Sequence, residues 1–194
     1  MKILFLFLII NLINFIFSTQ ATELVEIGSS AYNGDTTNQK KIILKLSEVA
    51  QVAYQNYGFP ISILIAQVIQ ETGWVSFIDS NMKPEWNNVL GMNKELLNDQ
   101  WESPWDGNFV EVSVPQYVDG EIVYGVETMR VYPDMESCLN DYSAFKIGIH
   151  GPIPDNMSID EIIDVYLKGY ATDPEYFNSI RRLIEKFDLN SYNN

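Results

Sequence analysis

The sequence has little of the chemistry that metal sites and disulfides require. It contains one cysteine, Cys138, and one histidine, His150. A disulfide within the chain is therefore excluded, as is a zinc site with several cysteine or histidine ligands, and we expect no metal and no cofactor. Basic residues are also scarce, 12 against 26 acidic ones, and the formal charge is −14. A charge of that sign repels phosphate groups, so we expect no nucleic-acid partner.

The only long apolar run, at 3–17, is shorter than the roughly 20 residues that cross a membrane. It follows the positive Lys2 and precedes the small, polar stretch 18–21, which is the order of a secretory signal peptide. The sequence therefore predicts a signal peptide over 1–21, a secreted or periplasmic protein, and no stable membrane insertion after cleavage. An uncleaved N-terminal anchor is the alternative.

The rest of the chain has the composition of a globular domain, since 46% of the sequence is hydrophobic and 20% is charged. Gly28, Gly34 and several serines, threonines and asparagines mark 22–38 as a linker or an N-terminal arm. We expect residues 39–194 to form one monomeric domain.

Hydrophobic spacing predicts helices and one hairpin within that domain. With their caps included, the helical segments are 39–57, 60–72, 134–149, 158–169 and 173–187. Alternation predicts strands at 109–117 and 121–132, with Asp119-Gly120 as the turn. The predicted fold class is therefore α+β, mostly helical with one β-hairpin.

Glu71 is the candidate for chemistry, because it ends the most apolar helix just before Gly73 and Trp74. The partial negative charge of a helix C-terminus and desolvation by apolar neighbours and Trp74 both raise the pKa of a carboxyl group. A carboxyl that stays protonated near neutral pH suits a general acid that protonates a glycosidic oxygen. Gln67, four residues earlier on the same helical face, could orient it. The alternative is a solvated glutamate at a helix end.

The segments 66–74 (AQVIQETGW) and 87–92 (NNVLGM) resemble two motifs of glycoside hydrolase family 73, N-acetylglucosaminidases that cut peptidoglycan. Two later segments, 129–132 (MRVY) and 169–176 (GYATDPEY), are similar to further motifs of that family. The resemblance covers about 40–192.

The resemblance implies a lysozyme-like α+β fold and a glucosaminidase-like catalytic domain at 39–194. It implies that peptidoglycan glycan strands are the partner and that the β-1,4 bond after N-acetylglucosamine is hydrolysed. It assigns the catalytic acid to Glu71 and places Tyr170 in the cleft.

One position departs from the family pattern, because Gln116 stands where many members carry a second glutamate on the first hairpin strand. A glutamate elsewhere on the hairpin could replace it, and the candidates are Glu111, Glu121 and Glu127. Strand alternation places Glu111 on the face opposite Gln116, unless Pro115 introduces a bulge. In a second interpretation the substrate's own acetamido group attacks the anomeric carbon, and Gln116 or Tyr170 stabilises that group or positions water. In a third, the protein binds glycan without cutting it. The intact surroundings of Glu71 favour the second.

Aromatic and amide side chains near these motifs are candidates for sugar binding. Trp74 and Trp105 could stack on sugar rings, or pack in the core. Asn87 and Asn88 could bind acetamido groups, or shape the turn. Two other functions stay open: a peptidoglycan amidase, which the single histidine disfavours, and a non-catalytic glycan-binding module.

Overall fold

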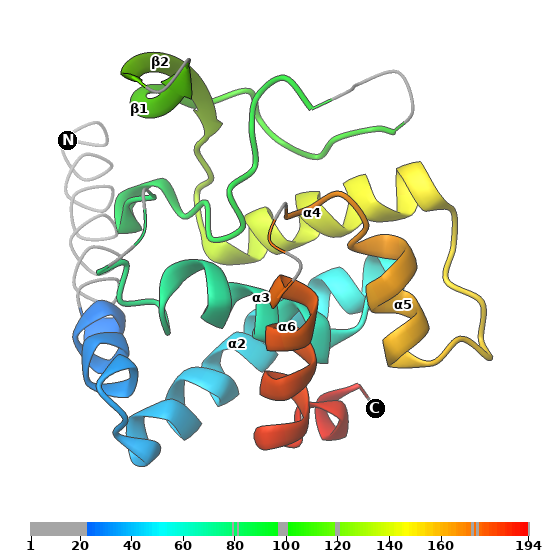
Figure 1. The fold of residues 1–194 in the computed structure, drawn as a ribbon. Coiled ribbons are helices and arrows are strands. Elements are labelled where there is room, and N and C mark those ends of the chain that lie inside the picture. The colour runs from blue at the N-terminus through cyan, green and yellow to red at the C-terminus, as the bar shows by residue number, and fades with distance from the viewer. Residues whose placement is uncertain are drawn as a thin grey trace, which may run out of the picture.

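The computed structural model describes residues 23–78, 80, 82–96, 101–118, 121–171, 173 and 175–193. The predicted signal peptide and the predicted turn at Asp119-Gly120 lie outside these residues. The helices are α2 (Thr36–Tyr57), α3 (Ile61–Thr72), α4 (Met135–His150), α5 (Ile159–Tyr166) and α6 (Glu175–Lys186), and short 3-10 helices span Pro84–Trp86 and Leu189–Tyr192. A two-stranded sheet of β1 (Phe109–Val118) and β2 (Glu121–Arg130) completes the α+β architecture, with the helices gathered around α3 and the hairpin above them (Figure 1). Among the described residues, no helix has the length and hydrophobicity to cross a membrane.

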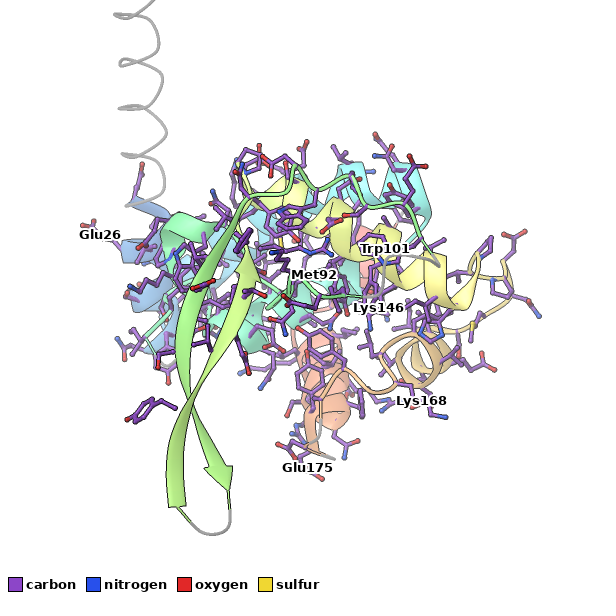
Figure 2. The ribbon with its side chains drawn as sticks, turned by 90° about the horizontal axis from the view of Figure 1, so that it is seen from above. Glu26, Met92, Trp101, Lys146, Lys168 and Glu175 are labelled. Carbon is purple, nitrogen blue, oxygen red and sulfur yellow. The ribbon has the colours of Figure 1, made fainter. Side chains whose placement is uncertain are left out.

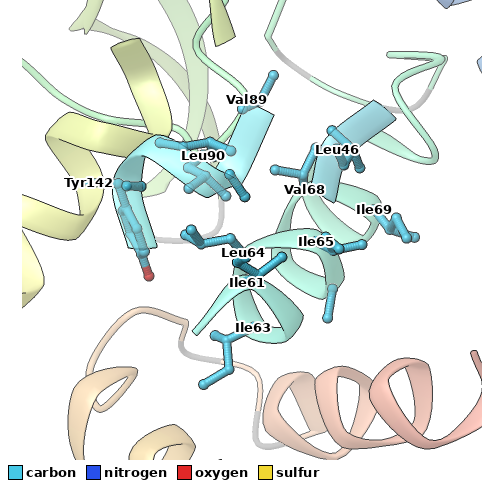
Figure 3. Close-up of a cluster of buried hydrophobic side chains, with 14 of the residues drawn as sticks. Leu46, Ile61, Ile63, Leu64, Ile65, Val68, Ile69, Val89, Leu90 and Tyr142 are labelled. Carbon is cyan, nitrogen blue, oxygen red and sulfur yellow. The ribbon is translucent and has the colours of Figure 1, made fainter. Parts of the chain in front are cut away.

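Helix α3 is the centre of the core, because its side chains are buried on every side. Ile63, Leu64 and Ile65 have no exposed surface although they point in different directions around the helix axis (Figure 3). A helix that is apolar all round is stable only when its neighbours enclose it, and α2, α6 and the C-terminal 3-10 helix contact it here. Gly73 ends the helix in the left-handed conformation at φ 57°, which confirms the predicted end of the helix.

The N-terminal part of the domain is more ordered than its composition indicates. Within the stretch 22–38, predicted to be a linker or an arm, residues 23–32 form a helix. Its apolar residues recur at helical spacing, and Ala31 is fully buried in the core. Helix α2 begins at Thr36, earlier than the predicted start at 39, because the side chain of Asp35 accepts hydrogen bonds from the first free backbone amides of the helix. The stretch is an arm packed on the body of the domain.

The hairpin has an unbroken register from the Phe109–Arg130 pair to the Val118–Glu121 pair. Pro115 pairs with Tyr124 in the same register as its neighbours, without a bulge. Glu111 therefore lies on the face opposite Gln116. The second strand ends at Arg130 rather than at the predicted residue 132. The amide of Val131 still donates to the carbonyl of Asn108 in the same register, but the amide of Tyr132 donates to the carbonyl of Trp86, outside the hairpin. Figure 2 shows the far end of the hairpin extending beyond the helical body.

Helices α4 and α5 begin at their predicted caps. Asp134 accepts from the amide of Ser137 at the start of α4, and Ser158 with Glu161 forms the predicted capping box of α5. Helix α5 ends at Tyr166, earlier than the predicted end near 169. Helix α6 then brings its apolar face back onto α3.

Candidate active site

Glu71 lies one residue before the end of α3, where the helix reaches an open pocket. The pocket has a volume of about 380 Å³, and its lining residues are Gln70, Glu71, Leu90, Gly91, Tyr170, Ala171 and Tyr176. Segments far apart in the sequence therefore meet around one carboxyl group. Glu71 is half-buried, and among the described residues that line the pocket it is the only one with a carboxylate.

Burial raises the pKa of the Glu71 carboxyl, and interactions with the hydroxyls of Tyr176 and Tyr170 oppose this in part. The direction agrees with the sequence prediction, but the surroundings differ from the predicted ones. The ring of Trp74 packs edge-on against Phe187 at 5.1 Å between centroids, and tyrosines line the pocket in its place. The result is a carboxyl group whose protonated form persists to higher pH than that of a solvated glutamate.

Two tyrosines, Tyr170 and Tyr176, line the pocket beside this carboxyl group, and a third, Tyr142, packs against Tyr170. The ring of Tyr170 contacts Tyr142 at 5.9 Å and Tyr176 at 5.3 Å, and its hydroxyl donates to the carbonyl of Leu90 at 2.9 Å. Burial raises the pKa of each of the three hydroxyls, so they stay neutral. Tyr176 and Tyr142 were not predicted as site residues. Tyr176 closes the motif at 169–176, and the spacing within that motif is the sequence signal that could have identified it.

Gln67 has no exposed surface and lies beneath the pocket rather than in its lining. Its amide nitrogen lies 3.3 Å from the hydroxyl of Tyr176 and donates to it. Gln67 was predicted to orient Glu71 and to bind substrate, and in this structure its side chain contacts Tyr176 beneath the pocket. The side chain positions Tyr176, which in turn lies against Glu71.

Asn87 and Asn88 shape the loop that forms one wall of the pocket. The Asn88 side chain is fully buried, donates to the carbonyls of Met92 and Arg130, and accepts from the amide of Met92. Asn87, at φ 50°, donates to the carbonyls of Tyr132 and Pro133. These bonds agree with the alternative in which Asn87 and Asn88 shape the turn rather than bind acetamido groups. The part of the loop that reaches the pocket is the backbone at Leu90 and Gly91.

Trp105 lies at the base of the hairpin. The guanidinium of Arg130 stacks on its ring at 4.5 Å and on the ring of Trp101 at 5.3 Å. The indole nitrogen of Trp105 donates to the carbonyls of Asn108 and Val131. Trp105 thus anchors the strand ends and does not line the pocket of Glu71.

The side chain of Gln116 lies outside the part of the molecule that the structure describes. Its backbone pairs with Val123, and cross-strand partners share a face of the sheet. The register places Glu121 and Glu127 on the same face as Gln116 and Glu111 on the other. Of the three proposed substitutes, two therefore share its face.

A larger pocket, of about 550 Å³, lies between residues 23–32, α2 and the start of α4. Its carboxylates, Glu23, Glu48, Asp134 and Glu136, are all exposed. It therefore lacks the desolvation that raises the pKa of Glu71. Cys138 is fully buried and burial raises the pKa of its thiol to about 12, so it has no nucleophilic role.

A mostly helical body, a hairpin and a half-buried carboxyl group in an open pocket define a glycoside hydrolase of the lysozyme-like class. The catalytic domain of the autolysin Auto from Listeria monocytogenes has this fold, with a TM-score of 0.59 and 22% identity over 79% of this chain and 86% of that one. The family model described as mannosyl-glycoprotein endo-beta-N-acetylglucosaminidase matches residues 47–189, and the chain belongs to this glucosaminidase family.

Two relatives of known name are consistent with this family. The peptidoglycan hydrolase FlgJ of Vibrio cholerae is 26% identical over 167 residues, which cover 80% of this chain and 46% of FlgJ. The exo-glucosaminidase LytG of Bacillus subtilis is 25% identical over 199 residues, which cover 97% of this chain and 65% of LytG. The chain thus spans about half the length of the first and two thirds of the second.

Proposed function

We propose that this chain is a secreted or periplasmic glycosidase that hydrolyses the β-1,4 bond after N-acetylglucosamine in peptidoglycan, with Glu71 as its general acid. The observation that carries the proposal is the half-buried carboxyl group of raised pKa in an open pocket. The names of the relatives, a peptidoglycan hydrolase and an exo-glucosaminidase, support the substrate.

The chemistry follows from the protonation state of Glu71. The neutral carboxyl donates its proton to the glycosidic oxygen as the bond breaks, and the resulting carboxylate accepts a proton from the attacking water. The hydroxyl of Tyr170, fixed by its bond to the Leu90 carbonyl, lies at the same pocket and is placed to contact the sugar.

We assign the nucleophile to the substrate's own acetamido group. The supporting observation is that the described lining of the pocket offers no second carboxylate beside Glu71. The acetamido oxygen attacks the anomeric carbon, and the cyclic intermediate then opens by addition of water. Gln116 or Tyr170 would stabilise the acetamido group.

The test is lysis of purified peptidoglycan by the wild type and by Glu71→Gln. Loss of a general acid lowers the rate by about 10²–10⁴-fold. Glu48→Gln is the matched control, because Glu48 is exposed and should leave the rate unchanged. A Glu71→Gln variant within about threefold of the wild type would exclude the assignment.

The substitution of the second glutamate by Gln116 favours one other function, a glycan-binding protein that does not cut. Mass spectrometry of digested peptidoglycan separates the possibilities. Reducing-end N-acetylglucosamine identifies a glucosaminidase, reducing-end N-acetylmuramic acid a muramidase, and free stem peptide an amidase. Binding without fragments at any dose identifies the binding protein.

Export depends on the segment 1–21, whose composition is that of a signal peptide. N-terminal sequencing of the exported protein should find a start within a few residues of Thr22, and gel filtration should give a monomer. A start at Met1 in the membrane fraction would identify the anchored form instead.

A further inference from the structure

The chain that follows Glu71 leaves α3 through an unusual turn. Gly73, Trp74 and Val75 have φ values of 57°, 64° and 64°, so three consecutive residues adopt the left-handed conformation. Glycine adopts this conformation freely, but a β-branched residue such as Val75 does so only when its surroundings enforce it. Something outside the turn must therefore hold it in this form.

Part of the restraint comes from Thr72, the residue next to Glu71. Its hydroxyl donates to the carbonyl of Val68 and accepts from the amide of Val75 at 2.8 Å. The carbonyl of Thr72 also accepts from the amide of Phe77 at 2.8 Å. The turn is thus bonded directly to the last residues of α3, and a shift of the turn displaces the end of the helix that carries Glu71.

The other part of the restraint is the helix at 23–32, drawn in blue in Figure 1. A Cβ atom on Gly28 would lie 2.4 Å from the carbonyl oxygen of Trp74 and 2.8 Å from the carbonyl carbon of Val75. The helix backbone therefore rests directly on the peptide groups of the turn. One helical turn later, the ring of Tyr32 covers Gly73, since a Cβ atom there would lie 3.0 Å from the ring.

The helix itself is fastened to the body of the domain. Ala31 is fully buried, and its carbonyl accepts from the side-chain amide of Gln39 in α2 at 3.0 Å. The helix cannot retreat from the turn without breaking this buried contact.

We propose that the helix at 23–32 is a positioning element of the active site, and that Gly28 holds the left-handed turn so that Glu71 keeps its place in the pocket. This inference rests on the proposed role of Glu71 as the general acid. Gly28 lies outside the family match at 47–189 and does not line the pocket, so it acts only through the turn.

The test is the Gly28→Ala variant. Its methyl group forces the helix and the turn apart, and a displacement of about 1 Å at a catalytic group lowers kcat by up to about 10²-fold. We expect kcat to fall by at least tenfold with KM nearly unchanged. Displacement also opens Glu71 to water, which lowers its pKa, so the alkaline limb of the pH–rate profile should move to lower pH.

The alkaline limb reports on Glu71 because the other groups that face it do not ionise in that range. These groups are Tyr142, Tyr170 and Tyr176, and the pKa of each lies above its ordinary value. Lys146 packs against Tyr170, and burial lowers its pKa to about 8. Because every variant compared retains Lys146, its ionisation contributes equally to all of their pH profiles.

Gly148→Ala is the matched control. Gly148 is also a helical glycine, and a Cβ atom there would lie 2.2 Å from Cβ of Trp101, away from the turn. Both variants should lose stability, measured as Tm, but only Gly28→Ala should move the alkaline limb. Tyr32→Ala provides a milder test, because Tyr32 is 42% exposed and its loss removes the cover on Gly73 without a collision.

Three outcomes decide the matter. A folded Gly28→Ala protein with wild-type kcat and pH profile overturns the inference. If that variant does not fold, Tyr32→Ala decides, and an unchanged kcat and profile there overturn it equally. An active Glu71→Gln enzyme overturns the proposed function itself, whereas an inactive one with a normal Gly28→Ala variant overturns only the positioning role.

Discussion

Arg130 and Asp141 form an ion pair of 2.7 Å whose two side chains are 1% and 0% exposed. Asp141 also accepts hydrogen bonds from the hydroxyls of Tyr132 and Ser103, both at 2.6 Å. The pair therefore joins the end of β2 to α4 through a network in which each carboxylate oxygen is satisfied. This network gives a structural reason for the Arg-x-Tyr spacing at the end of the strand.

Breaking this pair should be costly. Arg130→Met leaves the Asp141 carboxylate buried without its counter-charge, and we expect a loss of about 3–5 kcal/mol in the free energy of unfolding. Urea denaturation measures it. Arg181→Met is the control, because Arg181 pairs with Asp160 and Asp164 at the surface and should lose no more than about 1 kcal/mol. Equal losses in the two variants would contradict the structural role of the buried pair.

The pH dependence of lysis should depend on Tyr176. The interaction with its hydroxyl lowers the pKa of Glu71, so Tyr176→Phe should raise that pKa further. Because the general acid acts in its protonated form, the alkaline limb of the pH–rate profile should move to higher pH. Tyr166→Phe, which removes a hydroxyl bonded to the carbonyl of Gly151, should leave the limb in place. A limb that moves to lower pH in Tyr176→Phe would mean that the hydroxyl does not stabilise the Glu71 carboxylate.

The missing second glutamate leads to a prediction about substrate. If the acetamido group is the nucleophile, peptidoglycan with its N-acetyl groups removed should resist cleavage, and Gln116→Glu should change the rate little.

The competing mechanism uses a hairpin carboxylate. Glu121→Gln and Glu127→Gln test it, because these residues share the face of Gln116, and Glu111→Gln on the other face is the comparison. A loss of about 10² or more in one of these variants alone, with cleavage of deacetylated substrate, would replace the acetamido mechanism.

The buried Lys146 should destabilise the folded protein at neutral pH. It is 4% exposed, and burial lowers its pKa from 10.5 to about 8. At pH 7 the folded state must therefore hold a charge that it disfavours, by up to about 3 kcal/mol. We expect Lys146→Met to be more stable than the wild type in urea denaturation at pH 7.

The same lysine fixes the direction of the pH dependence. Between about pH 8 and 10.5 the unfolded chain still binds the proton that the folded state has released. The wild type therefore gains stability with rising pH in that window, relative to Lys146→Met, and the difference between the two should shrink. A difference that stays constant through this window would show that the ring faces of Tyr142, Phe145 and Tyr170 stabilise the charged form enough to offset its burial.

The parts of the molecule that could be predicted are those with local causes. Pro60 and Gly73 delimit an uninterrupted apolar helix, so the place of Glu71 at its end follows from the sequence. The roles of Asn88 and Trp105 could not be predicted in this way, because their hydrogen-bond partners at Arg130 and Val131 lie 42 and 26 residues further along the chain. An amide or an indole beside a sugar-binding motif looks the same in sequence whether it faces ligand or backbone.

The helix at 23–32 was missed for a related reason. Glycine and serine are typical of linkers, but Gly28 has an ordinary helical conformation and its missing side chain makes room for the backbone of another segment. Only the three-dimensional contact distinguishes a glycine that permits motion from one that permits close packing.

Because the helix at 23–32 packs on the turn after α3, the folding unit extends further towards the N-terminus than the family match does. The family match begins at residue 47, yet Ile42, Ile43 and Leu46 in the preceding part of α2 are at most 3% exposed. A fragment trimmed at residue 47 would remove these side chains and the helix at 23–32, and would leave the peptide groups of Trp74 and Val75 open to solvent. A shortened version of this domain, designed for engineering or for fusion, therefore has to include the helix at 23–32.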